Sequence, residues 1–526
     1  MIRYSSTRQL TIEGFETPFE NSLSADNRWV KFAGVVPWDK FAGMYMAKMK
    51  KDFGRPGISP RMVLGALIIK HIEKLDDRGV IQNIQENVYM QFFVGLSSFN
   101  PDPIFDPSLF VTIRKRIGAE SFDALNIALI QLISEKEDAK HIKKHTNDNT
   151  STQEPETSKG TQEQTIEKPK IPNKGKLQMD ATVADQEINY PTDTNMLRNS
   201  IKQSEKLIDK LYLLQGKKGN KPRTYRRKLN KKYLAFSKKR RKSKAEIRKT
   251  NRIFLSALKR NIGHINKMLD SFSNFPLLHR EQKMLWVINL VYDQQKYMFD
   301  HKVNAHPDRI VNIFQPHVRP IIRGKQNNKT EFGSKLGLSL DQELVRVNTL
   351  SWDAYNESGD LIGQVEAYYE LHNYYPELVQ VDKIYATREN RKYLKERGIR
   401  ITAAPLGRKK KEENETSYQK RKRKKEATER NRIEGKIGQA KRGYNLNNIR
   451  ARRKDTSESW IGAIIFIVNL LSIVRKVSIL LNFTKYSSKI RFRILIKRFR
   501  STIKCQMETY GLKKQNLVIL DYADIA

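Results

Sequence analysis

The sequence predicts a mixed α/β domain that carries a long, basic helical insertion and follows an all-α N-terminal domain. Apolar and polar residues alternate over 177–183, which is the period of a β-strand with one apolar face. The segments 377–386, 387–398 and 399–407 have the patterns of a strand, a short helix and a strand. This order is typical of a mixed α/β domain. Before 135 and between the first strand and about 300, apolar residues recur at helical spacing.

The charge of the chain indicates a polyanionic partner. Its 526 residues include 99 Lys and Arg but 57 Asp and Glu, a formal net charge of +42. Such an excess destabilises a compact state by self-repulsion, so nucleic acid is favoured as a partner over an anionic membrane surface. The single Cys505 excludes an intramolecular disulfide framework and a cysteine-built zinc cluster, and it fits a reducing cytosol. The opening MIRYSSTRQL has no apolar secretory core.

Residues 1–134 are expected to form the helical N-terminal domain. Ser59 and Pro60 have the pattern of a helix start, an N-cap followed by proline at the first position. Further on, apolar residues recur every fourth position, as on a core-facing helix: Val80, Ile84, Val88 and Phe92. A basic helix is expected to end the block. Helices of this kind fit binding to DNA ends, but a dimerisation or packing domain fits equally well.

Residues 135–176 are polar and contain no aromatic residue, which predicts a flexible linker. The basic helical insertion is predicted at about 196–300, as two long helices around a loop at 216–228. Between 201 and 260 we count 23 Lys and Arg against 3 Asp and Glu, a net charge of 23 − 3 = +20. A solvated helix face is rarely so one-sided, so we expect this segment to contact a phosphate backbone.

The α/β domain is expected to cover 177–484, with a basic C-terminal tail at 485–526. Further strands are predicted at 308–314 and at 344–355. The apolar run from Trp460 ends at Arg475, short of the roughly 20 residues that a membrane span needs. We therefore expect a buried core helix there.

Three carboxylates stand on separate elements of the predicted α/β domain. Asp180 lies on the first strand, Asp382 near the end of a later strand, and Glu434 on the helix after the sheet. Mg²⁺ prefers such oxygen ligands, and two ions about 4 Å apart can activate the attacking oxygen and stabilise the leaving oxygen in phosphodiester chemistry. We expect a site for two Mg²⁺ ions, for which Mn²⁺ can substitute.

The surroundings of Glu434 allow two interpretations. Arg430, Glu434 and Lys441 are spaced four and seven apart, so they fall within roughly 40° of one another on a helix. Arg430 and Glu434 could form an ordinary surface pair, worth a few tenths of a kcal/mol. Alternatively, both bases hold phosphate beside a metal site.

These residues resemble the bacterial insertion-sequence DDE transposases, which have an RNase H-like catalytic fold. One branch of that family carries Y-x2-R-x3-E-x6-K around its catalytic Glu, and Arg430, Glu434 and Lys441 match the R-x3-E-x6-K part, with Ala427 in the tyrosine position. The stretch DATVADQEINYPTD resembles the block around the family's first Asp, and VDKIYATRENRKYL the block around the second. In the second block Tyr385 matches, while Ile384 replaces the usual glycine.

The resemblance implies that Asp180, Asp382 and Glu434 are the catalytic, metal-binding residues of a DDE transposase. Such an enzyme binds the terminal inverted repeats of its element, hydrolyses a DNA strand with Mg²⁺, and joins the 3′-OH to target DNA. The resemblance also implies a homodimer on double-stranded DNA in the bacterial cytoplasm, with no membrane partner. Seven basic residues are candidates for DNA contacts, with ordinary surface charge as the alternative for the last four: Arg430, Lys441, Arg442, Arg319, Arg323, Lys325 and Lys335.

Two other functions fit the same residues. A metal-dependent nuclease of this fold would cleave DNA without strand transfer. A non-catalytic basic nucleic-acid-binding protein, such as a decayed transposase, would account for the departures at Ala427 and Ile384. His317 is expected to be structural rather than a ligand or base.

Overall fold

A computed structural model describes residues 22–47, 49, 57–131, 172–217, 219–322, 330–403 and 416–475. The chain divides into two compact units, Met1–Asn469 and Leu470–Ala526. Most of the predicted linker at 135–176 and all of the predicted tail at 485–526 lie outside the described residues. The same holds for Arg323 and Lys325.

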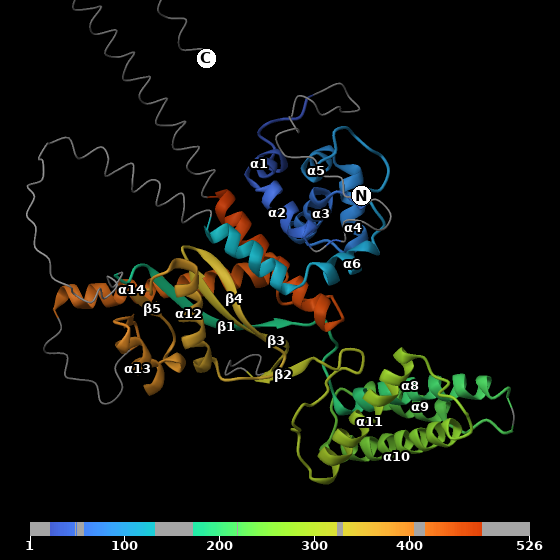
Figure 1. Cartoon of the computed structure of the whole chain (residues 1–526). Coiled ribbons are helices and arrows are strands. Elements are labelled where there is room, and N and C mark those ends of the chain that lie inside the picture. Colours follow the sequence, from blue (N-terminus) through green and yellow to red (C-terminus); the bar gives the residue numbers. More distant parts are fainter. Residues whose placement is uncertain are drawn as a thin grey trace, which may run out of the picture. The chain divides into compact units, whose positions relative to one another are not determined.

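A six-stranded mixed sheet carries the α/β fold (Figure 1). β3 runs antiparallel to β1, β2 and β4, whereas β5 is parallel to β1 and β6 is parallel to β5. The main path has the order β2 (Arg319–Ile322), β3 (Thr330–Asp341), β1 (Lys176–Asp185), β5 (Leu378–Gln380) and β6 (Arg400–Ile401), and β4 (Leu344–Ser351) pairs with β3. The predicted mixed α/β class is confirmed, including the helix α13 (Arg388–Glu396) between β5 and β6.

β1 is covered on both faces, although its alternating pattern predicted one apolar face. Leu177 and Met179 pack with residues of α12 (Asp360–His372) and α13. On the other face, Ala184 packs with β3, with α14 (Ser417–Gly438) and with the helix Lys454–Arg475. The polar residues of this second face are also buried, with 6% exposure at Gln178 and 1% at Thr182. Their polarity therefore does not mark a solvent face.

The prediction of a strand at 308–314 is wrong. These residues form turns and irregular backbone. Three of their apolar side chains are buried, but not in a sheet: Ile310 and Ile313 pack on Val287 of α11 (His279–Asp300), and Val311 packs with Trp352, whereas Phe314 is exposed. Short apolar runs occur both in strands and in buried segments of other conformation, because burial alone does not select a strand.

The helical insertion contains more helices than the two predicted. α8 (Asp193–Leu214) and α10 (Lys244–Leu269) are the long pair, α9 (Arg226–Ser237) lies between them in the chain, and α11 follows. These four helices share a core that includes Ile208, Phe254, Leu258 and Ile288. The sequence pattern did not predict α9. Leu229 is the only buried side chain of this fully described helix, which therefore has almost no apolar periodicity.

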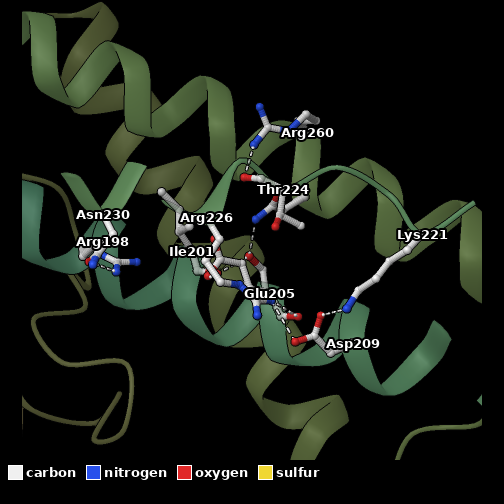
Figure 2. A network of polar contacts seen from close by, with 11 residues as sticks. Arg198, Ile201, Glu205, Asp209, Lys221, Thr224, Arg226, Asn230 and Arg260 are labelled. Carbon is white, nitrogen blue, oxygen red and sulfur yellow. Dashed lines mark hydrogen bonds and ion pairs between the residues drawn. The ribbon is translucent and has the colours of Figure 1, made fainter. Parts of the chain in front are cut away.

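A partly exposed polar network connects α9 to α8 (Figure 2). Arg226 contacts Glu205 at 3.2 Å and Asp209 at 2.8 Å, and Lys221 contacts Asp209 at 2.8 Å. Burial raises the pKa of Glu205, and the cations of Arg226 and Arg198 oppose that shift. Two of the three acids counted between 201 and 260 are therefore engaged with Arg226 and Lys221, and the third, Glu246, pairs with Lys239.

The N-terminal block is helical, as predicted. Val80, Ile84 and Phe92 are buried. α3 begins at Pro60 directly after Ser59, as the sequence predicted, although the Ser59 side chain makes no capping bond. The helices are α1 (Arg28–Val35), α2 (Trp38–Met46), α3 (Pro60–Ile72), α4 (Asp77–Glu86), α5 (Val88–Val94), α6 (Leu109–Arg116) and a further helix at 119–131.

The apolar helix Lys454–Arg475 is the predicted core helix. Within the described part of the chain it is long and apolar enough to cross a membrane by length and composition, and 89% of its most apolar window is buried in the protein. Its Asn469 side chain accepts a hydrogen bond from the Val345 backbone N–H and donates to the carbonyl of Val345 and to the side chain of Asn126. The helix thus joins β4 to the N-terminal helices.

A buried charge cluster lies where the N-terminal helices meet this core helix. The Lys70 ammonium is 4.2 Å from the ring centroid of Trp460 and pairs with Asp77, which also accepts two hydrogen bonds from Arg114 at 2.7 and 2.8 Å. Burial lowers the pKa of Lys70 to about 8 despite the opposing effect of Asp77. Burial raises the pKa of Asp77, but Arg114 and Lys70 outweigh it and hold the value below 3.8.

We predict that Asp77→Asn destabilises the protein by about 3 kcal/mol at pH 7, because it leaves two buried cations without their shared counterion. Asp77 has a lowered pKa, so its contribution is complete above its unfolded pKa and is lost as the pH falls through the lower pKa of the folded state. The difference from wild type should therefore shrink in acid. Urea unfolding measures both effects. Asp76→Asn is the matched control, because Asp76 caps α4 and asparagine caps equally well.

Candidate metal centre

Two of the three predicted carboxylates are brought to the same level of the sheet by strand register. β1 and β5 pair in parallel, with Gln178 opposite Gln380. Asp180, within β1, and Asp382, just after the end of β5, each follow two residues later, so they lie at the same level of neighbouring strands. Asp180 is half-buried, and its Oδ1 accepts the Ala181 N–H at 2.8 Å. Asp382 directly precedes the short 3-10 helix η3 (Lys383–Tyr385), and its side chain is 57% exposed.

Glu434 comes to the same face on α14. In β1, Gln178 and Asp180 are two apart and share a face, and Gln178 contacts the backbone of α14. Arg430 of α14 forms an ion pair with Asp382 and lies 3.6 Å from Glu434. The i,i+4 pair considered from the sequence therefore exists, but its arginine also reaches Asp382. One guanidinium thus links two of the three predicted metal ligands.

The helix that carries Glu434 changes its winding before Lys441. α14 ends at Gly438 and continues as the π-helical turn η5 (Gln439–Gly443). Lys441 lies 3.5 Å from Glu331 on β3, and the side chain of its neighbour Arg442 is exposed. Single π-helical turns are frequent at functional sites. Arg430 is thus close to Glu434, whereas Lys441 points toward β3.

The other predicted DNA contacts lie apart from these residues. Arg319 on β2 donates to the carbonyl of Pro316 and lies 3.7 Å from Asp353. Lys335 pairs with Val183 in the sheet and so lies on the face covered by α12, and its ammonium contacts Glu357, in the 3-10 turn η2 (Glu357–Gly359) before α12, at 2.9 Å. The structure does not bring Lys335 to the face of Asp180.

Buried tyrosine and histidine side chains lie near these elements. Tyr385 is fully buried, and its hydroxyl has no hydrogen-bond partner within the described segments. Burial raises the pKa of Tyr385, with Glu357 and Asp180 adding to the shift. His317 packs edge-on against Trp352 at 4.4 Å, and burial lowers its pKa to about 4. A histidine that is neutral and packed in this way fits a structural role.

The three carboxylates suit a hard divalent cation by their chemistry. All three offer oxygen donors, which Mg²⁺ prefers. The Arg430 guanidinium is a cation that already lies between Asp382 and Glu434, so it stands where positive charge is stabilised. Across the described ranges, however, no three His, Cys, Asp or Glu side chains converge closely enough to hold one ion. An ion would therefore have to replace Arg430 between the two carboxylates.

Sequence reasoning missed Gln178 and Gln380. Each lies two residues before a predicted ligand, in QMD at 178–180 and QVD at 380–382. Both glutamines are buried and both bond to α14. The repeated Gln-x-Asp spacing was the available signal, because residues two apart on a strand share a face.

Comparisons with known proteins agree with this chemistry. Residues 379–471 match the family model described as "Transposase DDE domain", and residues 17–116 match "Transposase domain (DUF772)". The chain is 34% identical over 106 residues to "Uncharacterized protein ORF8 in nfe locus" of Rhizobium meliloti, a match that covers 19% of this chain and 49% of the relative. The chain thus spans about half the length of that relative. No solved structure matches.

These matches confirm the resemblance to the DDE transposases. The DDE match includes Asp382, Glu434 and the Arg430 between them, whereas Asp180 lies outside both matched segments.

We predict that Asp180→Asn, Asp382→Asn and Glu434→Gln each weaken Mn²⁺ binding at least about tenfold, since each removes a charged oxygen ligand. Calorimetric titration without DNA measures the affinity. The control is Glu429→Gln, which lies on the same helix but pairs with Lys176. Equal loss in the control and in Glu434→Gln would show that general negative charge, rather than a defined site, attracts the ion.

Proposed function

We propose that this protein is a transposase that cleaves the ends of its own DNA element and transfers them to target DNA. The observation that carries the proposal is the placement of Asp180 and Asp382 at one level of neighbouring parallel strands, with Glu434 on the helix that covers them. The transposase family matches at 17–116 and 379–471 support the same function.

The proposed catalytic domain is RNase H-like. The sheet supports this, because antiparallel β1, β3 and β4 adjoin the parallel pair β5 and β6. Asp180 lies on the first strand, Asp382 after a later one, and Glu434 on a helix after the sheet. This is the order of carboxylates that the resemblance implied.

The proposed chemistry has two steps. Water adds to a phosphorus at the element end, and the bond to the 3′ oxygen breaks, which leaves a 3′-OH. That hydroxyl then attacks a phosphodiester of the target, so one P–O bond forms and another breaks. Bound Mg²⁺ supplies the Lewis acid for the attacking and leaving oxygens. Asp180, Asp382 and Glu434 would hold the ions.

Arg430 would exchange partners during this reaction. With no ion bound, its guanidinium neutralises Asp382 and Glu434. If those carboxylates held metal, Arg430 would be free to hold a phosphate of the DNA, for which its planar fork is suited. Lys441, Arg442 and Arg319 are the further phosphate contacts we propose, on a homodimer bound to double-stranded DNA in the cytoplasm.

The exposed face of α9 is the second DNA contact we propose. Arg227 and Lys231, and likewise Lys228 and Lys232, are one helical turn apart and exposed. None of these four has a hydrogen-bond or ion-pair partner within the described residues, whereas Arg226 and Lys221 are engaged with Asp209 (Figure 2). A turn rises about 5.4 Å. Two rows of unpaired cations at this spacing suit a phosphate backbone, and their repulsion needs a polyanion to offset it.

We predict that Asp180→Ala, Asp382→Ala and Glu434→Ala each abolish Mg²⁺-dependent cleavage of element-end DNA while binding to that DNA persists. Removing a carboxylate adds no repulsion toward phosphate and deletes only a metal ligand. Gel assays of cleavage and of binding measure the two effects separately. Near-normal cleavage by any one variant would remove that residue from the proposed site.

Strand transfer with pre-cut ends decides between the proposal and its nearest alternative. A transposase joins the free 3′-OH to a second duplex, whereas a nuclease of the same fold cleaves but leaves the ends unjoined. If the protein bound DNA but neither cleaved nor joined it, the result would favour a non-catalytic DNA-binding protein.

We predict that neutralising the α9 face in Arg227→Gln, Lys228→Gln, Lys231→Gln and Lys232→Gln together lowers the salt slope of binding to random duplex. The slope should fall by about 0.9 for each lost phosphate contact, so by about 3.6 at most. Fluorescence anisotropy over a salt series gives the slope.

The matched control removes the same charge from exposed positions on α10 and after α11, in Arg252→Gln, Lys259→Gln, Lys267→Gln and Lys302→Gln. A smaller change in this control would locate the contact on α9. Equal changes in both variants would mean that the DNA responds only to net charge.

A further inference from the structure

Two glutamines form a direct link between the strands that carry Asp180 and Asp382. Gln178 and Gln380 lie opposite each other in the parallel register of β1 and β5. The side-chain amide of Gln178 donates to the Gln380 side-chain oxygen at 2.6 Å. The exposed fraction is 6% at Gln178 and 0% at Gln380. Buried amides of this kind are costly unless they are bonded, so their partners should matter.

Both glutamines also hold the helix that carries Glu434. Gln178 donates to the Glu429 carbonyl at 2.8 Å, and Gln380 donates to the Glu426 carbonyl at 3.0 Å. Three residues of α-helix rise about 4.5 Å, close to the roughly 4.8 Å between neighbouring strands. The spacing of the Glu426 and Glu429 carbonyls along α14 therefore matches the separation of β1 and β5, so each glutamine can bond to one carbonyl.

The other contacts of α14 with the sheet are apolar or partly exposed. Among the described residues of α14 the buried side chain is Ile433, and Ile437 is partly buried beside it. The ion pairs Lys176–Glu429, Arg400–Glu426 and Arg430–Asp382 are partly exposed, and exposed pairs contribute little. A slip of α14 by one residue would move Glu434 by about 1.5 Å along the helix axis and turn it by about 100°. Such a slip would break both glutamine bonds.

We propose that Gln178 and Gln380 are positioning residues that set the register of α14, and thereby place Glu434 beside Asp180 and Asp382 for binding a divalent cation. This assignment rests on the metal site of the proposed function, but not on what the site does to DNA. The glutamines touch neither the ion nor the substrate. They act through the backbone of α14.

Gln364 on α12 provides a matched control. It is 2% exposed, so it is also a buried glutamine of the same sheet domain. It belongs to the helix that covers the opposite face of β1, and its amide atoms have no hydrogen-bond partner within the described ranges. Gln364→Met therefore tests the loss of a buried amide without any effect on α14.

The experiment compares Gln178→Met, Gln380→Met and Gln364→Met by Mn²⁺ titration without DNA and by thermal unfolding. Methionine keeps the length of the side chain and removes the donor. We expect Mn²⁺ binding to weaken at least about tenfold in the first two variants and to stay within about twofold of wild type in Gln364→Met. If a methionine variant does not fold, Gln380→Asn retains the amide but withdraws it from Glu426.

A second arm repeats Gln380→Met in the Glu434→Gln background. If Gln380 acts through Glu434, then Gln380→Met should cause little further loss of Mn²⁺ affinity in the Glu434→Gln background. The reason is that the ligand positioned by Gln380 has already been removed in that background. A full additional tenfold loss would overturn the proposal, as would wild-type affinity in Gln178→Met and Gln380→Met. Absence of a saturable Mn²⁺ site in the wild-type protein would overturn it as well.

These outcomes are separable from the fate of the proposed function. If the wild-type protein binds Mn²⁺ but neither cleaves nor joins DNA, the transposase proposal fails while the titrations still decide the role of the glutamines. If it cleaves and joins DNA while the glutamine variants bind Mn²⁺ normally, the function stands and the positioning role is refuted.

Discussion

The parallel pairing of β1 with β5 is the constraint on which the candidate site depends. It sets Gln178 opposite Gln380, and the two-residue period of a strand then carries that alignment to Asp180 and Asp382. A shift of one residue in this pairing would turn one of the two aspartates to the face of α12. The 2.6 Å bond between the glutamine side chains is formed only in the observed register. The register of β1 and β5 therefore determines how the two aspartates of the candidate site are aligned.

Several acids of this basic protein bind cations that connect its elements. Asp77 binds Lys70 and Arg114 where the N-terminal helices meet the core helix, and Glu205 with Asp209 binds Arg226 in the insertion. In the candidate centre the same arrangement recurs, with Arg430 between Asp382 and Glu434. The difference is exposure: Asp382 and Glu434 are more than half exposed, so their cation can be exchanged for another. The less exposed acids Asp77, Glu205 and Asp209 bind cations of the fold, whereas Asp382 and Glu434 are the acids that we propose to bind metal.

Much of the secondary structure was predictable because local patterns carry it. The first strand, the helix between β5 and β6, the N-terminal helices and the apolar core helix all have periodic apolar residues, and all are present. The prediction failed at 308–314, where an apolar run packs on α11 and Trp352 rather than in the sheet. It also missed α9, which a polar network rather than an apolar stripe attaches to α8.

The sequence alone determined the chemistry available: an excess of cations that calls for a polyanion, three carboxylates on separate elements, and the spacing of Arg430 from Glu434. Only the tertiary structure decided how these meet. It turned Lys441 toward Glu331 through a π-helical turn, linked Arg430 to a residue 48 positions earlier in the chain (430 − 382 = 48), and buried Gln178 and Gln380 beneath α14. The physical reason is that periodicity reports which side of an element is covered, whereas strand register and helix packing, which are non-local, select the partner.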